Sequence, residues 1–120
     1  MAGGFTIKHD DELERDYGKW VLVRKSLGVD SFGINAVELP PGESIPEHDE
    51  TDRDQEEVFF VVTGAPTLVV DGVEHPLRPG SFVRLDTEPT RTIRNDGQDA
   101  ATVLIISAPV SSGYQPMDWA

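Results

Sequence analysis

Short apolar segments that alternate with turn signals constrain the fold of this chain more than any other feature of its sequence. The segments are rich in Val, Ile, Phe and Thr, which favour strands, and the 9 Pro and 11 Gly would interrupt most helices. Strands are therefore expected at residues 19–25, 31–39, 57–63, 67–71, 73–77, 81–85, 90–94 and 101–107. Regularly punctuated short strands of this kind predict an all-β sandwich or barrel.

The turn signals are pairs and triplets of Gly, Pro, Asn and Asp. Asp71-Gly72 is the sharpest, because a two-residue type I′ turn needs positive φ at both positions and Asp and Gly tolerate it. It predicts a hairpin between the strands at 67–71 and 73–77. The others are Leu27-Gly28, Pro40-Pro41-Gly42, Gly64-Ala65-Pro66, Pro79-Gly80 and Asn95-Asp96-Gly97.

The length of the chain favours a single domain. A chain of 120 residues can bury one core, and no repeat, low-complexity tract or change in composition marks a linker. We expect a polar N-terminal segment over residues 1–18, a barrel over 19–109 and a C-terminal tail over 110–120.

Charge and cysteine content disfavour several classes of function. With 10 Lys and Arg against 22 Asp and Glu, the net charge of −12 argues against nucleic-acid and anionic membrane partners. The absence of cysteine excludes disulfides, cysteine-ligated zinc and a thiol nucleophile. The N-terminus lacks the basic and apolar stretches of a secretory signal, so a cytoplasmic protein is expected. Nucleophile elbows and glycine-rich phosphate loops are also missing from the sequence.

One expected strand is apolar on both faces. Phe59 and Val61 point to one side of it. Val58, Phe60 and Val62 point to the other. One side faces the interior of the fold, and the other needs a cover because large exposed apolar patches are unusual on a soluble monomer. A second sheet layer, a terminal segment or another subunit would supply that cover, and of these we expect another subunit, in a homodimer.

Two stretches have a spacing known from a protein family. The first reads Gly42, five residues, His48, a run rich in acidic residues, Glu57, six residues and Gly64. It resembles the first motif of the cupin superfamily, Gly-x5-His-x-His-x3,4-Glu-x6-Gly.

The second stretch reads Gly80, five residues, Asp86-Thr87-Glu88, two residues, Arg91, three residues and Asn95. Its spacing is similar to that of the second cupin motif, Gly-x5-Pro-x-Gly-x2-His-x3-Asn. The similarity covers residues 32–107 and implies a small antiparallel jelly-roll barrel, usually dimeric, with a pocket inside it.

In metal-binding cupins the first motif supplies two His and a Glu, and the second motif supplies a third His. His48 matches the first His and Glu57 matches the Glu. The second His position is Glu50 when counted forward from His48. Counted backward from Glu57 it is Asp52 or Arg53, because the spacing here is longer than in the family.

Arg91 stands where the family has its last His, and this changes the expected chemistry. A guanidinium has no lone pair to give and stays charged, so Arg91 cannot ligate a metal. One hypothesis is that an ion pair between Glu57 and Arg91, with two parallel hydrogen bonds, has replaced the metal. Another is that Arg91 captures an anionic group of a ligand. The remaining alternative is a reduced site for Mn, Fe or Zn formed by His48, Glu50 and Glu57.

The sequence therefore predicts a cupin-like barrel that binds a small molecule, anionic in the second hypothesis, without a catalytic metal. The expected ligand-binding residues are His48, Glu57, Phe59, Phe82, Arg91 and Ile93, of which the apolar ones also fit a role in core packing. The alternatives are a metal-dependent cupin enzyme, either an oxygenase or an isomerase, and a structural or regulatory dimer with a filled barrel. Many activities share this barrel, so the resemblance does not choose among them.

Overall fold

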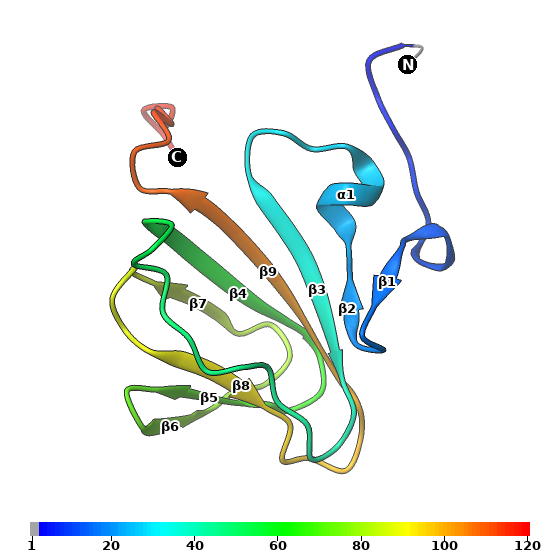
Figure 1. Ribbon diagram of the computed structural model, residues 1–120, viewed down its shortest axis with the longest axis vertical. Helices are drawn as coiled ribbons and strands as arrows, with labels where there is room; N and C mark the ends of the chain where they lie inside the picture. The colour runs from blue at the N-terminus through cyan, green and yellow to red at the C-terminus, as the bar shows by residue number, and fades with distance from the viewer. Residues whose placement is uncertain (1–2) are drawn as a thin grey trace.

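Two antiparallel sheets form the body of the protein in a computed structural model that describes residues 3–120 (Figure 1). The six-stranded sheet has the order β1-β2-β3-β9-β4-β7, with bounds Arg15–Asp16, Trp20–Val21, Gly33–Leu39, Ala101–Pro109, Gln55–Thr63 and Phe82–Leu85. The three-stranded sheet has the order β6-β5-β8, with bounds Val73–Pro76, Thr67–Val70 and Arg91–Arg94. A 3-10 turn, Asp10–Glu12, and one helix, α1 at Val23–Leu27, precede β3. The predicted all-β antiparallel barrel is confirmed.

The strand predicted at residues 19–25 is wrong in its second half. Only Trp20–Val21 is strand there, and Val23–Leu27 forms α1. The helix ends at Gly28, which has a left-handed φ of 78° and donates its N–H to the Arg24 carbonyl at 2.8 Å. A glycine cap of this type stops a short helix and outweighs the strand preference of one valine.

The hairpin predicted at Asp71-Gly72 is confirmed. These residues join β5 to β6, with Val70 paired to Val73. Both have positive φ, 48° at Asp71 and 79° at Gly72, as a type I′ turn requires. The turn fixes the register of the smaller sheet and so places β8 on the other side of β5.

The core lies between the two sheets. Its buried members come from both, and they are Val37, Leu39, Ile45, Phe59, Val61, Leu68, Leu85, Ile93 and Val103. Alternation along β4 thus buries Phe59 and Val61 completely, as predicted. The opposite, outer face of the larger sheet is apolar as well and more exposed.

Phe82 belongs to that outer face, which corrects its predicted place in the pocket. It pairs with Phe60 across β7 and β4, and the two rings lie 4.4 Å apart between centroids. Because Val83 and Leu85 take the inward positions of β7, Phe82 points outward and is 75% exposed.

Asn95 and Gly64 close one end of the barrel. Asn95 is fully buried, and its side-chain amide donates to the carbonyls of Leu39 and Asp99, both at 2.8 Å. Gly64 has a φ of 84°, and a Cβ at that position would lie 2.6 Å from Ala101 Cα. At this end, therefore, the buried amide has its hydrogen bonds satisfied, and there is no space for an extra methyl group at position 64.

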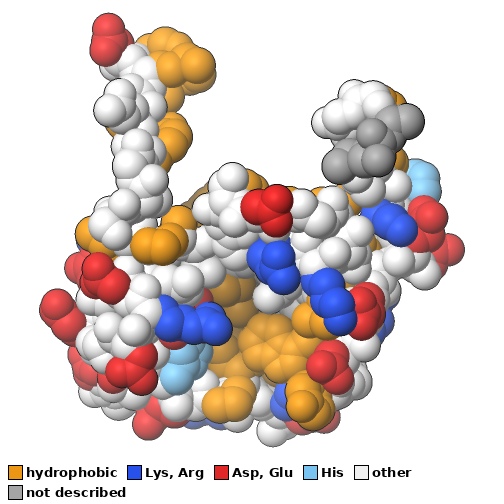
Figure 2. Space-filling view, turned by 45° about the horizontal axis from the view of Figure 1, so that its top comes forward, with side chains coloured by type: hydrophobic (Ala, Val, Ile, Leu, Met, Phe, Trp, Pro, Cys, Tyr) orange, Lys and Arg blue, Asp and Glu red, His pale blue; other side chains and the backbone are white. Residues whose placement is uncertain are grey.

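The opposite end of the barrel is open. Figure 2 shows a hollow lined by hydrophobic side chains, with basic side chains at its rim and acidic ones farther out. Both terminal segments project away from the barrel at the top of Figure 1. Within residues 3–120, no helix has the length and apolar character needed to cross a membrane.

Candidate functional site

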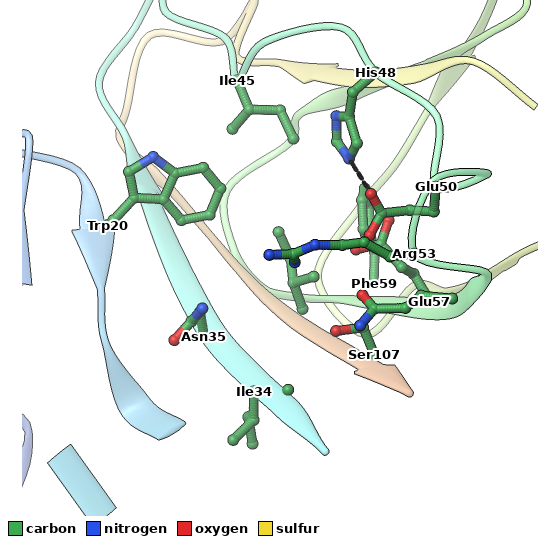
Figure 3. A pocket seen from close by; sticks show the side chains of 13 residues that line it. Trp20, Ile34, Asn35, Ile45, His48, Glu50, Arg53, Glu57, Phe59 and Ser107 are labelled. Atoms are coloured by element: carbon green, nitrogen blue, oxygen red, sulfur yellow. Dashed lines mark ion pairs between the residues drawn. The ribbon is translucent and has the colours of Figure 1, made fainter. Parts of the chain in front are cut away.

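A cavity of about 160 Å³ lies at the open end, between the inner face of the larger sheet and the segment 44–54 that precedes β4. Figure 3 shows side chains from both walls turned toward this space. Its apolar lining includes Trp20, Ile45, Phe59 and Ile105; its polar and charged lining consists of Asn35, His48, Glu50, Arg53, Gln55, Glu57 and Ser107. The cavity is therefore lined by both apolar and polar side chains, as ligand pockets commonly are.

Strand alternation explains why β4 supplies so much of this lining. Gln55, Glu57 and Phe59 share one face of the strand, and all three border the cavity. Arg53 lies one further step of two residues back, at the end of the loop, and borders the cavity too. One face of β4 thus carries an amide, a carboxylate and an aromatic ring, and the turn before the strand adds a cation.

Gly33, on β3, leaves space for the hydroxyl group of Ser107 on the neighbouring strand β9. It pairs with Ser107 across β3 and β9, and a Cβ at position 33 would lie 2.5 Å from Ser107 Oγ. With no side chain at Gly33, the Ser107 hydroxyl fits beside the cavity.

His48 is held by its backbone and by one ring nitrogen. Its N–H donates to the Arg91 carbonyl at 3.0 Å, and the Arg91 N–H donates back at 2.8 Å. Its Nδ1 lies 2.9 Å from the Pro46 carbonyl, and because a carbonyl can only accept, Nδ1 carries the hydrogen. Nε2 consequently faces the carboxylates, 3.8 Å from Glu57 Oε1 and 3.9 Å from Glu50 Oε2.

Glu57 and Arg91 face one another, as the ion-pair hypothesis predicted. Arg91 Nε lies 3.3 Å from Glu57 Oε1, and the Arg91 side chain has no exposed surface. The expected pair of parallel hydrogen bonds is absent, and neither of these two buried atoms has a hydrogen-bond partner among the described residues. The contact is an ion pair without hydrogen-bond alignment.

Backbone carbonyls take the remaining donors of Arg91 and explain that geometry. Nη1 donates to Pro89 at 2.6 Å and to Thr87 at 3.4 Å, while Nη2 donates to Asp86 at 2.6 Å. The guanidinium therefore fastens the loop between β7 and β8 and presents only its Nε edge to Glu57. It stands behind the cavity wall and has no surface there.

The environment of Glu57 raises the pKa of its carboxyl above the ordinary value. Burial is the main cause, and the neighbouring carboxylate of Glu50 adds to it. The positive charge of Arg91 and the proximity of His48 oppose the rise without cancelling it. Glu57 is thus a carboxyl group that holds its proton more tightly than a carboxyl in water does.

Arg53 is a cavity-lining residue that sequence reasoning did not assign to the site. Its side chain extends across the pocket toward Trp20 (Figure 3), and it has no hydrogen bond or ion pair with any other residue of the described chain. From the sequence, Arg53 was named only as one candidate for the second His position of the first motif. Because Arg53 lies in the turn before β4 and Asp54 has a φ of 50°, strand alternation does not place its side chain, and the sequence offered no signal for it.

The other predicted site residues fall into two groups. His48, Glu57 and Phe59 border the cavity. Ile93 is fully buried in the core instead, because it occupies an inward position of β8 packed between the sheets. Its assignment to the pocket is corrected to core packing.

A divalent metal does not fit the donor set. His48, Glu50 and Glu57 supply one imidazole and two carboxylates. However, Glu57 Oε1, the oxygen that faces His48, is already in contact with the Arg91 cation. Within residues 3–120, no group of three or more His, Cys, Asp or Glu side chains is arranged to hold a metal ion. The cation that stands against Glu57 is the Arg91 guanidinium.

Acidic side chains border the cavity on the outside. Glu47, Asp49, Asp52 and Asp54 lie in the segment before β4, and all four are exposed. Thr51 donates two hydrogen bonds to Asp49, from its N–H and its hydroxyl, which lower the pKa of that carboxyl. The unpaired guanidinium of Arg53 is therefore set within a negatively charged rim.

Comparison with known proteins agrees with this architecture. A family model described as "Cupin domain" matches residues 35–107. A cupin protein from Bacteroides fragilis superposes with a TM-score of 0.74 at 20% identity, over 92% of this chain and 93% of its own. No curated protein matches the sequence.

Two further solved structures are similar. A predicted oxalate decarboxylase from Thermotoga maritima has a TM-score of 0.72 at 17% identity, covering 88% of this chain and 100% of its own. A sugar phosphate isomerase of a cupin superfamily from Silicibacter pomeroyi has a TM-score of 0.66 at 26% identity, covering 76% of this chain and 59% of its own. The first of these likenesses concerns the fold alone.

Proposed function

The chain belongs to the cupin domain family, and from that premise we propose that its cavity binds a small organic anion through Arg53, without a catalytic metal. The observation that carries the proposal is the free guanidinium turned into the cavity of a strongly acidic protein. The other described arginines that border charged groups are already paired with carboxylates or carbonyls. A guanidinium with all its donors free in a pocket is a ready partner for a carboxylate or a phosphate.

The rest of the lining suits a ligand that also carries a hydroxyl. Glu50 and Glu57 offer acceptor oxygens, while Asn35 and Ser107 offer both donors and acceptors. Trp20 and Phe59 cover the apolar part of such a molecule. The sugar phosphate isomerase neighbour is named for an anionic substrate class, which is consistent with this ligand class. The open cavity also favours ligand binding over a filled, purely structural barrel.

Calorimetric titration of the chelator-treated protein with propionate and with inorganic phosphate tests the proposal. Arg53→Gln should weaken binding of the preferred anion about tenfold to a hundredfold, the worth of charge-assisted hydrogen bonds. Arg78→Gln is the matched control, because Arg78 also lacks a side-chain partner in the described chain but does not border the cavity. Its affinity should equal that of the wild type.

Two results would overturn the proposal. If the Arg53 and Arg78 variants bind the anion equally well, the guanidinium is not the recognition group. If untagged protein retains stoichiometric Mn, Fe or Zn that is lost in His48→Ala, the site is a metal centre after all, and the metal-dependent enzyme replaces the binding protein.

We further propose that a second copy covers the outer face of the larger sheet. The rows Val58–Ile106 and Phe82–Phe60–Leu104 are in register across β7, β4 and β9 and form an apolar surface. A twofold axis would place this surface against itself, which buries it in both copies. Light scattering should give a dimer mass for the wild type and a monomer mass for Phe82→Asp; a monomeric wild type would remove the proposal.

A further inference from the structure

The cavity holds only a small part of an ordinary metabolite. An apolar cavity of about 150 Å³ accommodates benzene, so a volume of about 160 Å³ corresponds to a group of about six to eight non-hydrogen atoms. An acid group with a short chain fills it. A larger ligand must extend through the open side.

The open side leads to Trp20. This side chain borders the cavity and also two outer grooves, of about 630 Å³ and about 290 Å³. Ile45 is shared by the cavity and the larger groove, and Asn35 by the cavity and the smaller one. The cavity and the two grooves therefore adjoin one another at the indole, which lines all three. The hollow in Figure 2 is hydrophobic at its centre, as this arrangement requires.

Tyr17 stands at the far side of both grooves in a conformation that costs energy. Its φ is 52°, in the left-handed region that bulky side chains avoid, and its neighbour Gly18 has a φ of 71°. Glycine would occupy position 17 without strain. The turn instead carries a tyrosine that is 84% exposed beside Trp20. Strain of this kind at a pocket mouth indicates a functional requirement for the side chain.

From these observations we infer that the ligand is an amphipathic acid, with its anionic group at Arg53 and a flat apolar body lying over Trp20 against Tyr17. The inference rests on the proposed function and adds the class of ligand. A half-buried indole at the cavity and an exposed phenol ring beside it bind a planar group by stacking and by burial of its surface.

A matched pair of acids tests this directly in calorimetry. Propionate carries the acid group alone, and 3-phenylpropionate adds the flat body. The phenyl group should tighten binding to the wild type about tenfold, as expected for one well-placed aromatic contact. In Tyr17→Gly the gain should fall below about twofold while propionate affinity stays unchanged. Tyr114→Gly is the control, since Tyr114 is also exposed but lies in the C-terminal tail.

A second readout reports contact with Trp20 itself. The chain has 2 Trp, and the other, Trp119, is exposed in the tail, so Trp119→Phe leaves Trp20 as the single fluorophore. Saturation with 3-phenylpropionate should shift its emission to shorter wavelength more than saturation with propionate does.

The outcomes separate the inference from the proposed function. If propionate binds but the phenyl group adds nothing, or if the gain survives in Tyr17→Gly, the amphipathic ligand is wrong and anion binding stands. If neither acid binds but inorganic phosphate does, the inference fails alone. If none of the three anions binds, or if neutral 3-phenylpropionamide binds as tightly as the acid, anion binding fails and the inference fails with it.

Discussion

The two ends of the barrel are built from the same strands and differ in what those strands turn inward. Along β3 the inward residues change from Leu39 and Val37, both fully buried, to Asn35 and Gly33 at the cavity. Along β4 they change from Val61 and Phe59 toward Glu57, Gln55 and the loop residue Arg53. The change occurs within single strands, without a break in pairing.

The difference between the ends teaches how stability and binding are divided. At the closed end the one buried amide, on Asn95, uses its donors on backbone carbonyls and accepts from the Gly97 N–H. At the open end some polar groups have unused donors and acceptors: the side chains of Asn35 and Arg53 have no hydrogen-bond partner in the described chain. A close-packed half with satisfied hydrogen bonds therefore supports a half with unused donors and acceptors, as the proposed ligand binding requires.

Arg91 lies at the junction of the two halves, and its loss should have the largest effect. Arg91→Met leaves Glu57 buried without a cation and three loop carbonyls without a donor. Breaking a buried pair in this way costs about 3–5 kcal/mol. Urea unfolding measures it. The double variant Glu57→Leu with Arg91→Met should recover part of the loss, and no recovery would mean that the clamp on the loop, rather than the unpaired charge, dominates.

Alanine substitutions at one glycine of each end compare the space available for a methyl group. Gly64→Ala must place a methyl group against Ala101 Cα at positive φ, so we expect a loss of about 2–4 kcal/mol. At Gly33→Ala the obstacle is the rotatable Ser107 hydroxyl, and the loss should stay below about 2 kcal/mol. Thermal and urea unfolding of both variants provide the comparison. Equal losses would mean that the open end is packed as tightly as the closed one.

Alanine substitutions at one asparagine of each end compare how much side-chain hydrogen bonds contribute to stability. Asn95→Ala removes the donor from the buried Leu39 carbonyl and from the more exposed Asp99 carbonyl, and should cost about 2 kcal/mol. Asn35→Ala removes no hydrogen bond within the described chain, so its free energy of unfolding should change by less than about 0.5 kcal/mol. The same unfolding assay serves for both. A larger loss at position 35 than at position 95 would contradict the division described above.

Glu57 adds a small, pH-dependent difference. The folded state raises the pKa of this carboxyl above 4.5, so it binds the proton more readily than the unfolded chain. Its contribution to stability therefore falls as pH rises from that value through the raised one, by no more than about 1.4 kcal/mol per pH unit. Unfolding curves of wild type and Glu57→Gln between pH 4 and 8 should differ by this slope. Glu56→Gln, on the exposed face of β4, controls for the loss of charge, and a difference of opposite sign would mean that Arg91 outweighs burial.

Alternation and motif spacing were sufficient to predict most of the fold and the charged pair. The inward position of Glu57 followed from its parity with Phe59 and Val61, and its meeting with Arg91 followed from the motif resemblance. The hairpin at Asp71-Gly72 followed from local φ requirements alone. These features depend on one strand or one turn at a time.

Features that depend on neighbouring elements were not predictable in the same way. Phe82 was assigned to the pocket as an apolar residue, whereas its register opposite Phe60 turns it outward. The hydrogen bonds of Arg91 go to a loop whose path no spacing specifies. The cavity lining by Trp20 and Asn35 requires knowing that β2 lies beside β3, a pairing that only the folded sheet defines.

The acidic segment before β4 has a consequence for how an anion arrives. Exposed carboxylates at the rim repel a negative ligand at long range, while the guanidinium attracts it only within the last few ångströms. Raising the ionic strength from about 10 mM to about 150 mM shortens the Debye length from about 30 Å to about 8 Å. The repulsion is then screened more than the short contact, so association should become faster as salt is added. A protein of this charge thus takes up its ligand more readily in a salty medium than in a dilute one.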